Sequence, residues 1–355
     1  MRKITGILSV LFAAMLGFSA CAAAQDNTKV QAKSAETALD VQENAADGTA
    51  TETAEDPMHM SIVTTIFPEY DWVMNILGDK SENAEVTMLL DNGVDLHSYQ
   101  PTAMDIAKIA DCDLFIYVGG ESDEWVEDAL AESTNPDMKV INLLEVLGDS
   151  VKEEEIKEGM EHDHEEGEDH DHDHEEPEYD EHVWLSLRFA SVICKKIADT
   201  VAEIDSTNAE SYKSNAESYI SELNALDSEY SDVIGSASCR TLLFGDRFPF
   251  RYLTDDYGLD YYAAFVGCSA ETEASFETII FLSEKVDERN LKNVMIIESS
   301  DGKIAQTIID NTESKDQQIL TLDSMQSTTS KDVQSGSSYL SIMKSNLEVL
   351  KTALN

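Results

Sequence analysis

Short apolar runs alternate along this chain with segments in which apolar residues recur at helical spacing. In residues 61–142 the runs are rich in β-branched and aromatic residues and predict four strands, at 61–67, 84–90, 112–118 and 138–142. Helices are predicted between them, at 69–78, 101–110 and 123–133. Strands that alternate with helices pair in parallel through crossover connections, so this stretch predicts a parallel sheet flanked by helices.

The same alternation returns near the C-terminal end. Four more strands are predicted, at 241–244, 261–266, 293–298 and 318–322. The helices that go with them are predicted at 247–256, 272–288, 302–313 and 338–353. The sequence therefore contains two similar α/β halves.

Long helical patterns separate the two halves. Residues 187–204 and 209–234 have apolar positions at helical spacing, and 205–208 interrupts them. A helix of about 26 residues is roughly 39 Å long, enough to bridge two lobes. The predicted fold is α/β, with two lobes that each hold a mainly parallel sheet flanked by helices and are joined by one long helix. In such sheets ligands bind beyond the carboxyl ends of the strands.

The N-terminal region predicts export. A basic start, an apolar stretch from Ile4 to Phe18 and small residues before Cys21 resemble a bacterial lipoprotein signal, with Cys21 as the lipidated residue. Ordinary signal cleavage near Ala22 is the alternative. Residues 21–57 are polar, acidic and without aromatic residues, so we expect a tether that builds no core. The expected location is extracytoplasmic, with the chain anchored to the bacterial membrane by lipid.

These observations divide the chain into five parts. We expect a signal peptide at 1–20, the tether at 21–57, an N-terminal lobe at 58–205, a linking helix at 206–235 and a C-terminal lobe at 236–355.

An acidic, histidine-rich run interrupts the N-terminal lobe at 153–181, and we expect a loop there that collects metal ions. Five of the eight histidines of the chain lie inside it: His162, His164, His170, His172 and His174. Imidazole is a preferred ligand of borderline cations such as zinc, so the clustering points to metal binding. The alternative is a solvated acidic loop without a ligand.

The net charge of −47 makes cations the natural partners of this chain. Binding to nucleic acid or to an anionic membrane surface through basic patches is not expected.

Four cysteines follow Cys21, and none of them forms a CxxC pair that would suggest a zinc finger or a redox motif. Cys239 and Cys268 are the best candidates for a disulfide, because the chain is expected to be exported. Cys112 and Cys194 are expected to be buried as small apolar residues.

Two histidines outside the run, His97 and His182, are candidate metal ligands. His97 follows a predicted strand and precedes a helix that Pro101 can begin, and His182 lies just before Trp184 and another helix. Taken alone, a histidine in such a position is more often an ordinary hydrogen-bonded residue of the surface or the core. Their position at loop edges, next to the histidine-rich run, favours a metal site.

Several motifs of the chain resemble those of the zinc- and manganese-binding lipoproteins of ABC importers. They are LDNGVDLHSYQPTAMD, the acidic histidine-rich loop, DEHVWLSLRFA, the long helix and LTLDSMQ followed by SYLSIMKSNLEVLKTAL, and the match covers about residues 60–355. The resemblance implies two α/β lobes, a rigid connecting helix and one divalent ion in the cleft, with two ligands from each lobe.

Carried over residue by residue, the resemblance implies His97 and His182 as the first two ligands and Asp323 as the fourth. The third position falls on Gly245, which has no side chain to donate. Asp246 is the nearest substitute. Glu298, Glu271 or a water molecule are the alternatives for the third ligand, and Asp246 could instead pair with an arginine or cap a helix.

The expected function is capture of zinc outside the membrane and its delivery to an ABC permease by a monomeric, non-enzymatic protein. Zinc is favoured over manganese because, in the family, histidine-rich loops accompany zinc importers. The alternatives are a manganese importer component, a surface adhesin or metal buffer, and an extracytoplasmic zinc hydrolase. The hydrolase would need an open coordination position and a general base, and the sequence has no HExxH motif.

Overall fold

The computed structural model describes residues 59–160, 178–269 and 273–355, which belong to one compact unit. Five sets of predictions lie outside these residues: the signal peptide, the tether, the lipidation of Cys21, the metal-collecting role of the five clustered histidines, and Glu271 as a ligand.

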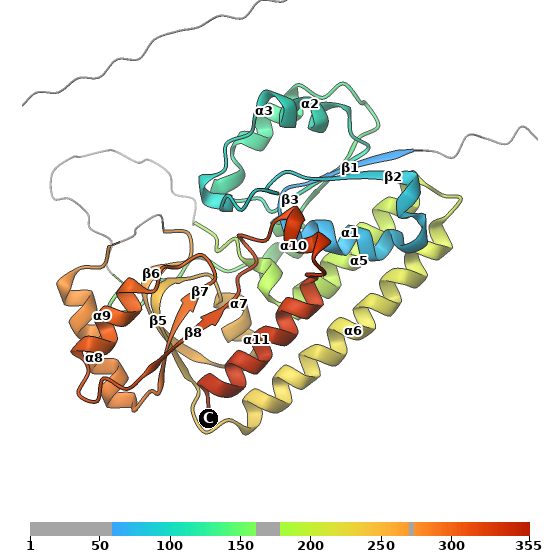
Figure 1. Cartoon of the computed structure of the whole chain (residues 1–355). Coiled ribbons are helices and arrows are strands. Elements are labelled where there is room, and N and C mark those ends of the chain that lie inside the picture. Colours follow the sequence, from blue (N-terminus) through green and yellow to red (C-terminus); the bar gives the residue numbers. More distant parts are fainter. Residues whose placement is uncertain (1–58, 161–177, 270–272) are drawn as a thin grey trace, which may run out of the picture. The chain divides into compact units, whose positions relative to one another are not determined.

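A four-stranded parallel sheet forms the centre of the N-terminal half (Figure 1). Its strands are β1 (Met60–Thr64), β2 (Ala84–Met88), β3 (Leu114–Tyr117) and β4 (Lys139–Asn142), in the order β2-β1-β3-β4. Helices α1 (Phe67–Leu77) and α2 (Ala103–Asp111) pack against β1. In this order β2 lies on one side of β1, and β3 and β4 lie on the other. Ligands of open parallel sheets bind where the strand order reverses in this way, so we expect ligand-binding loops beyond the carboxyl ends of β1 and its neighbours.

A second four-stranded parallel sheet forms the centre of the C-terminal half. Its strands are β5 (Thr241–Phe248), β6 (Asp260–Val266), β7 (Asn293–Ile297) and β8 (Gln318–Leu322), in the order β6-β5-β7-β8. Helices α8 (Phe276–Arg289) and α9 (Lys303–Asn311) pack on this sheet. The two sheets confirm the predicted α/β fold class.

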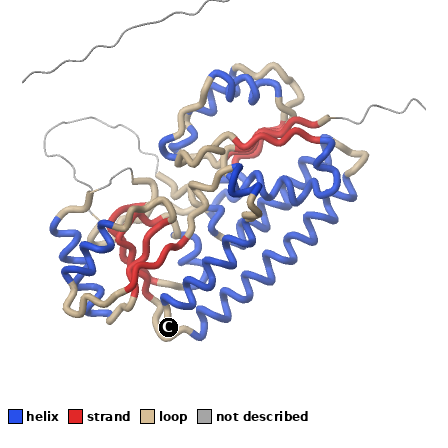
Figure 2. Tube along the Cα trace, viewed as in Figure 1, coloured by secondary structure: helices blue, strands red, loops and turns tan. Residues whose placement is uncertain are grey.

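The helices between and around the sheets are mostly those predicted from the sequence (Figure 2). The remaining ones are α3 (Trp125–Ala131), α4 (Leu143–Leu147), α5 (Leu187–Ile204), α6 (Ala209–Ser236), α7 (Arg251–Tyr257), α10 (Ser330–Gln334) and α11 (Tyr339–Ala353). The short helices α4 and α10 were not predicted. Helix α6 has 28 residues and contacts α1 and α5 as well as α7 and α11, so it packs on elements of both halves.

Strand β5 differs from its prediction in a way that matters for the site. It continues four residues beyond Phe244, and its register against β6 shifts between Phe244 and Arg247. Pro249 follows the extended strand, so α7 begins only at Arg251 rather than at the predicted residue 247. Gly245 and Asp246 therefore lie inside a strand and not in a loop.

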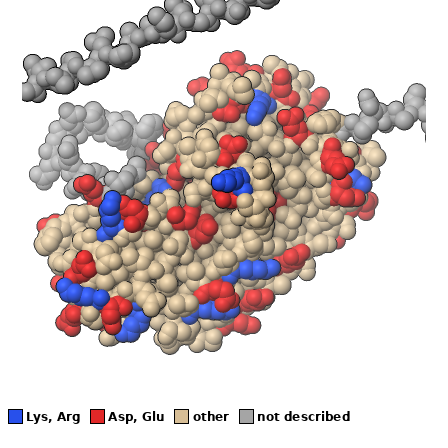
Figure 3. Space-filling model, in the orientation of Figure 1, with Lys and Arg blue, Asp and Glu red and all other residues tan. Residues whose placement is uncertain are grey.

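Acidic residues are spread over the face shown in Figure 3, and lysine and arginine residues are fewer there. That face has no continuous basic surface, in keeping with a chain that has 71 acidic and 24 basic residues. Among the residues that the structure describes, no helix combines the length and the apolar character needed to cross a membrane.

Candidate metal centre

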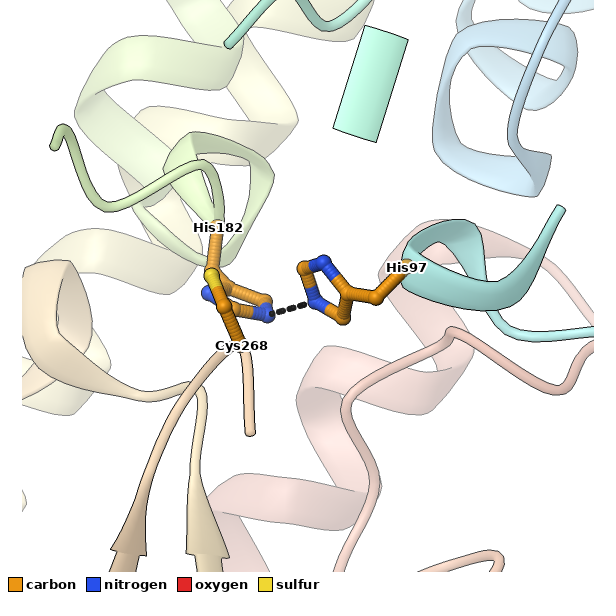
Figure 4. A group of neighbouring side chains, drawn as sticks. All are labelled: His97, His182 and Cys268. Carbon is orange, nitrogen blue, oxygen red and sulfur yellow. Dashed lines mark hydrogen bonds between the residues drawn. The ribbon is translucent and has the colours of Figure 1, made fainter. Parts of the chain in front are cut away.

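His97 and His182 face each other in the structure (Figure 4). Their Nε2 atoms are 3.2 Å apart, and their ring centroids are 5.1 Å apart. The His182 side chain is fully buried, and the His97 side chain keeps 8% of its surface exposed. The sequence separates the two residues by 85 positions, so the fold alone creates this pair.

Local hydrogen bonds fix the backbone of His97. The residue lies in a short 3₁₀ turn, Leu96–Ser98, and its backbone N–H donates to Oδ1 of Asp95, which caps the turn. Asp95 is also paired with Arg247, which comes from β5 of the other half. The loop after β2 is thereby tied to the C-terminal sheet.

His182 is anchored from both sides. Before it, the Asp180 carbonyl accepts a 2.7 Å hydrogen bond from the Tyr252 hydroxyl. After it, the Trp184 indole N–H donates to the Ser324 carbonyl, and the Tyr339 hydroxyl donates to the Trp184 carbonyl, at 2.9 and 2.7 Å. These bonds hold the His182 segment against residues of α7, α11 and the loop after β8.

A carboxylate lies behind each imidazole. Asp180 Oδ1 accepts from the backbone N–H of His182 and lies 3.1 Å from its Nδ1. His97 Nδ1 lies 2.7 Å from the Ser122 hydroxyl and 3.4 Å from Oε2 of Glu181, which is almost fully buried. An ionised aspartate can only accept a hydrogen bond, so Asp180 favours the His182 tautomer that carries its proton on Nδ1. In that tautomer the His182 Nε2 atom has a lone pair for a cation.

Glu181 is suited to hold His97 in the same tautomer. Burial raises the pKa of this carboxyl group, but the neighbouring His97 ring and hydrogen bonds from Ser122 outweigh burial and bring the pKa below its usual range. Oε1 accepts from the Ser122 backbone N–H, whereas Oε2 has no hydrogen bond of ordinary geometry from the described residues. A proton on His97 Nδ1 would face this buried oxygen, leaving Nε2 free for a cation.

Cys268 completes a group of three donors. One donor atom each of His97, His182 and Cys268 lie within 4.8 Å of one another, and no other such group of His, Cys, Asp or Glu occurs among the described residues. Figure 4 shows the thiol beside the His182 ring. Burial, together with the charges of Glu181 and Glu154, raises the pKa of the Cys268 thiol.

Cys268 was not predicted to belong to this group. The disulfide predicted between Cys239 and Cys268 is not formed, since both thiols are free. The available signal was position: Cys268 follows the end of β6 by two residues, at the sheet edge where ligands are expected. The other cysteine prediction agrees with the structure, because Cys112 and Cys194 are buried.

Gly245 is not a vacant ligand position. A Cβ atom built on it would lie 2.5 Å from the backbone of Ala305 in α9, so the residue must be glycine for the helix to pack on β5. Asp246, proposed as its substitute, accepts hydrogen bonds from the backbone N–H groups of Arg247 and Ile297, at 2.9 and 3.4 Å. The structure gives Asp246 a place in the sheet and does not bring it to the histidines.

Glu298 also has a structural role. Its two oxygens accept hydrogen bonds from the backbone N–H groups of Ser324, Gln326 and Ser327, so it organises the loop after β8. The structure does not place it with the histidines.

Asp323 begins that loop, and its Oδ1 accepts from the Met325 N–H at 2.8 Å. Burial and the nearby Glu298 raise the pKa of Asp323 to about 6. Its carboxylate lies outside the group of three donors.

The structure describes both ends of the histidine-rich run, up to residue 160 and from residue 178. Glu153 and Tyr179 form an antiparallel bridge, and the N–H of Asp180 donates to the Lys152 carbonyl at 2.9 Å. Glu154 accepts from the backbone N–H of Cys268 at 3.2 Å. The run therefore starts and ends beside the three donors.

Comparisons with known proteins give consistent matches. A family profile described as "Zinc-uptake complex component A periplasmic" matches residues 62–353. The zinc-binding lipoprotein AdcA of Streptococcus pneumoniae is 32% identical over 298 residues, which cover 82% of this chain but 55% of the relative. The high-affinity zinc uptake system protein ZnuA of Bacillus subtilis is 31% identical, with 84% of this chain and 88% of the relative covered. The chain thus spans only about half the length of the AdcA relatives it matches.

Solved structures show the same similarity. The Zn(II)-bound ZnuA-like domain of S. pneumoniae AdcA has a TM-score of 0.65 at 28% identity, covering 83% of this chain and 99% of that domain. A laminin-binding protein of Streptococcus agalactiae, described as bifunctional with adhesin and metal-transporting activity, has a TM-score of 0.66 at 25% identity, covering 83% of this chain and 100% of that protein.

Proposed function

Because this chain belongs to the family of the periplasmic component A of zinc-uptake complexes, we propose that it binds zinc outside the cell membrane and delivers it to the permease of an importer. Proteins of this family are components of zinc-uptake complexes, and binding and release of the ion require no catalysis. The zinc ion is the cargo, held until the permease accepts it.

The pair of imidazole nitrogens is the observation that carries this proposal. In a tetrahedral zinc site with Zn–N bonds of about 2.0–2.1 Å, two coordinating nitrogens lie about 3.3 Å apart. The Nε2 atoms of His97 and His182 are 3.2 Å apart, so one ion can bind both with almost no movement of the rings.

The carboxylates behind the rings support the same proposal. Histidine ligands commonly donate their second N–H to a carboxylate, which fixes the tautomer and strengthens the metal bond. Asp180 and Glu181 are placed to do this for His182 and His97.

Asp323 is retained in the proposal as a fourth donor that approaches when the ion binds. Its support is its place beyond β8, at the edge where ligands of parallel sheets collect. An Asp323→Asn variant would weaken zinc binding if this role is real and would leave it unchanged otherwise.

The clustered histidines serve, in this proposal, to collect ions weakly and pass them to the histidine pair. Two variants separate the roles: one replaces His97 and His182 by Ala, and the other replaces His162, His164, His170, His172 and His174 by Asn. In a zinc titration against a competing chelator, the first should lose the tight site, and the second should keep it while losing weakly bound ions.

The reverse outcome would favour a metal-buffering surface protein. A link to import requires cells: in a strain that lacks this chain, zinc accumulation should be restored by the five-histidine variant and not by the pair variant. Restoration by both variants would contradict delivery through the histidine pair.

The proposal places the chain at the outer face of a bacterial membrane as a monomer, held by lipid on Cys21. A Cys21→Ala variant should then leave the membrane fraction for the soluble fraction. Mass spectrometry of the N-terminal peptide would identify the lipid, and an unmodified Cys21 would contradict the anchor.

A further inference from the structure

We infer that the Cys268 sulfur is a third ligand of the ion bound by His97 and His182. The site then has two nitrogens and one sulfur, a donor set for a thiophilic divalent cation such as zinc. This inference rests on the proposed function and deepens it, because it identifies the donor that selects the ion.

Distance allows this coordination. With a Zn–S bond of about 2.3 Å and Zn–N bonds of about 2.0–2.1 Å, a tetrahedral site needs S···N separations of about 3.6 Å. One donor atom of each residue already lies within 4.8 Å of the other two. The sulfur therefore needs to approach the ring nitrogens by no more than about 1 Å for one ion to bind all three residues.

The backbone before Cys268 is shaped to bring its thiol to the imidazole. A Cβ atom on Gly267 would lie 2.9 Å from Cε1 of His182, so only glycine lets the turn after β6 approach the ring this closely. The N–H of Cys268 donates to Glu154 Oε1, which fixes the turn to the segment that leads toward the histidine-rich run.

No other role accounts for this cysteine. Its thiol is free rather than joined to Cys239, and it is only partly buried, unlike Cys112 and Cys194. It lies at the edge of the second sheet and faces His97 and His182, which come from two different loops (Figure 4). The third ligand position of the family falls instead on Gly245, where the backbone of Ala305 leaves no room for a side chain.

The sulfur would decide which ion the site prefers. Thiolate and imidazole together suit zinc, whereas manganese prefers carboxylate, carbonyl and water oxygens. On binding, the thiol proton leaves to solvent and the sulfur bonds to the ion. We therefore expect zinc to outcompete manganese, and Cys268 to be the residue that sets this preference.

Cobalt substitution tests the inference directly. Co²⁺ is added to the full chain and to the variants Cys268→Ser and Cys239→Ser, and the near-ultraviolet thiolate-to-cobalt charge-transfer band is recorded. The histidine-rich run at 153–181 contains no cysteine, so it cannot produce a thiolate band. The unmodified chain and Cys239→Ser should show the band, and Cys268→Ser should lack it. Zinc affinity should fall more than about 100-fold in Cys268→Ser, above the 10–100-fold typical of residues behind the ligands.

The outcomes separate this inference from the proposed function. If the unmodified chain binds one Co²⁺ tightly but shows no band, or if Cys268→Ser keeps it, Cys268 is not a ligand and zinc capture by the histidines stands. If the unmodified chain has no tight site for Co²⁺ or Zn²⁺, both fail. The band of the unmodified chain decides the first question even if Cys268→Ser does not fold.

Discussion

His97 and His182 meet through their Nε2 atoms at 3.2 Å, while the Nδ1 atom of each ring faces a carboxylate. This arrangement supports the proposed role of both histidines as metal ligands, because a carboxylate behind a ring fixes the orientation and the tautomer of the ring. It also predicts that residues which never touch the ion control its affinity.

Replacement of the supporting carboxylates should therefore weaken zinc binding without removing a ligand. We expect Glu181→Gln and Asp180→Asn each to lower zinc affinity by about 10–100-fold, because an amide can hold Nδ1 unprotonated and so present the wrong tautomer. Competition titration measures the change. Glu178→Gln is the control, because Glu178 lies on the same segment and makes no hydrogen bond to either ring among the described residues. An equal loss of zinc affinity in Glu178→Gln would indicate a general effect of charge.

Gly267 predicts a steric effect on the site. In Gly267→Ala the new methyl group would meet the His182 ring and the Phe248 carbonyl at 2.9 Å, so the ring must move and zinc affinity should fall at least tenfold. Gly235→Ala in α6 is the matched control, since nothing lies within 4 Å of a Cβ atom there, and helix propensity should add up to about 1 kcal/mol of stability. Unchanged affinity in Gly267→Ala would show that the ring has more room than the structure indicates.

The buried carboxyl group of Asp71 should make the stability of the fold depend on pH. Burial raises the pKa of this carboxyl group from 3.8 to about 6, although Tyr219 donates a hydrogen bond to it. The folded protein thus binds a proton that the unfolded chain releases between about pH 4 and pH 6. The contribution of Asp71 is most favourable below about pH 4 and becomes less favourable as pH rises through 6, by up to about 3 kcal/mol.

Asp71→Asn should remove this dependence. Urea denaturation of the zinc-free chain at several pH values should show a shallower fall in unfolding free energy between pH 4 and pH 6 than in the unmodified chain. Identical slopes would mean that Asp71 ionises normally in the folded state.

Removal of the hydrogen bond between Tyr339 and Trp184 should lower the stability of the fold. Tyr339→Phe removes the hydroxyl that donates to the buried Trp184 carbonyl at 2.7 Å, leaving that carbonyl unsatisfied at a cost of about 1–3 kcal/mol. Tyr179, with 46% of its surface exposed, provides the control, and Tyr179→Phe should change stability little. Thermal unfolding of both variants measures the difference, and equal midpoints would contradict the role of this bond.

The sequence predicted the sheets well because buried parallel strands appear as continuous apolar runs. All eight predicted strands are present. The end of β5 was misplaced because Gly245 and Asp246 have low strand propensity. The strand continues past them because Arg247 and Phe248 pair with β6. Helices α4 and α10, with five residues each, were too short for their periodicity to be recognised.

The histidine pair could be predicted from the sequence, whereas the only signal for the sulfur was the position of Cys268, two residues after the end of β6. His97 and His182 both carry loop and edge signals, and the structure brings them together. Cys268 has no ligand spacing to any other residue, so its role depends on a contact across 86 positions from His182, which only the packing of the two halves creates. The sequence alone does not explain the glycine at position 245, because the close approach of α9 to β5 that requires it is visible only in the fold.

The central claim is that one zinc ion lies between His97 and His182. Anomalous diffraction at the zinc edge, from crystals of the zinc-loaded chain with the five clustered histidines replaced by Asn, locates the ion directly. We predict one strong peak about 2.0–2.1 Å from both Nε2 atoms. A crystal with zinc bound elsewhere and no peak between these two rings would contradict the account.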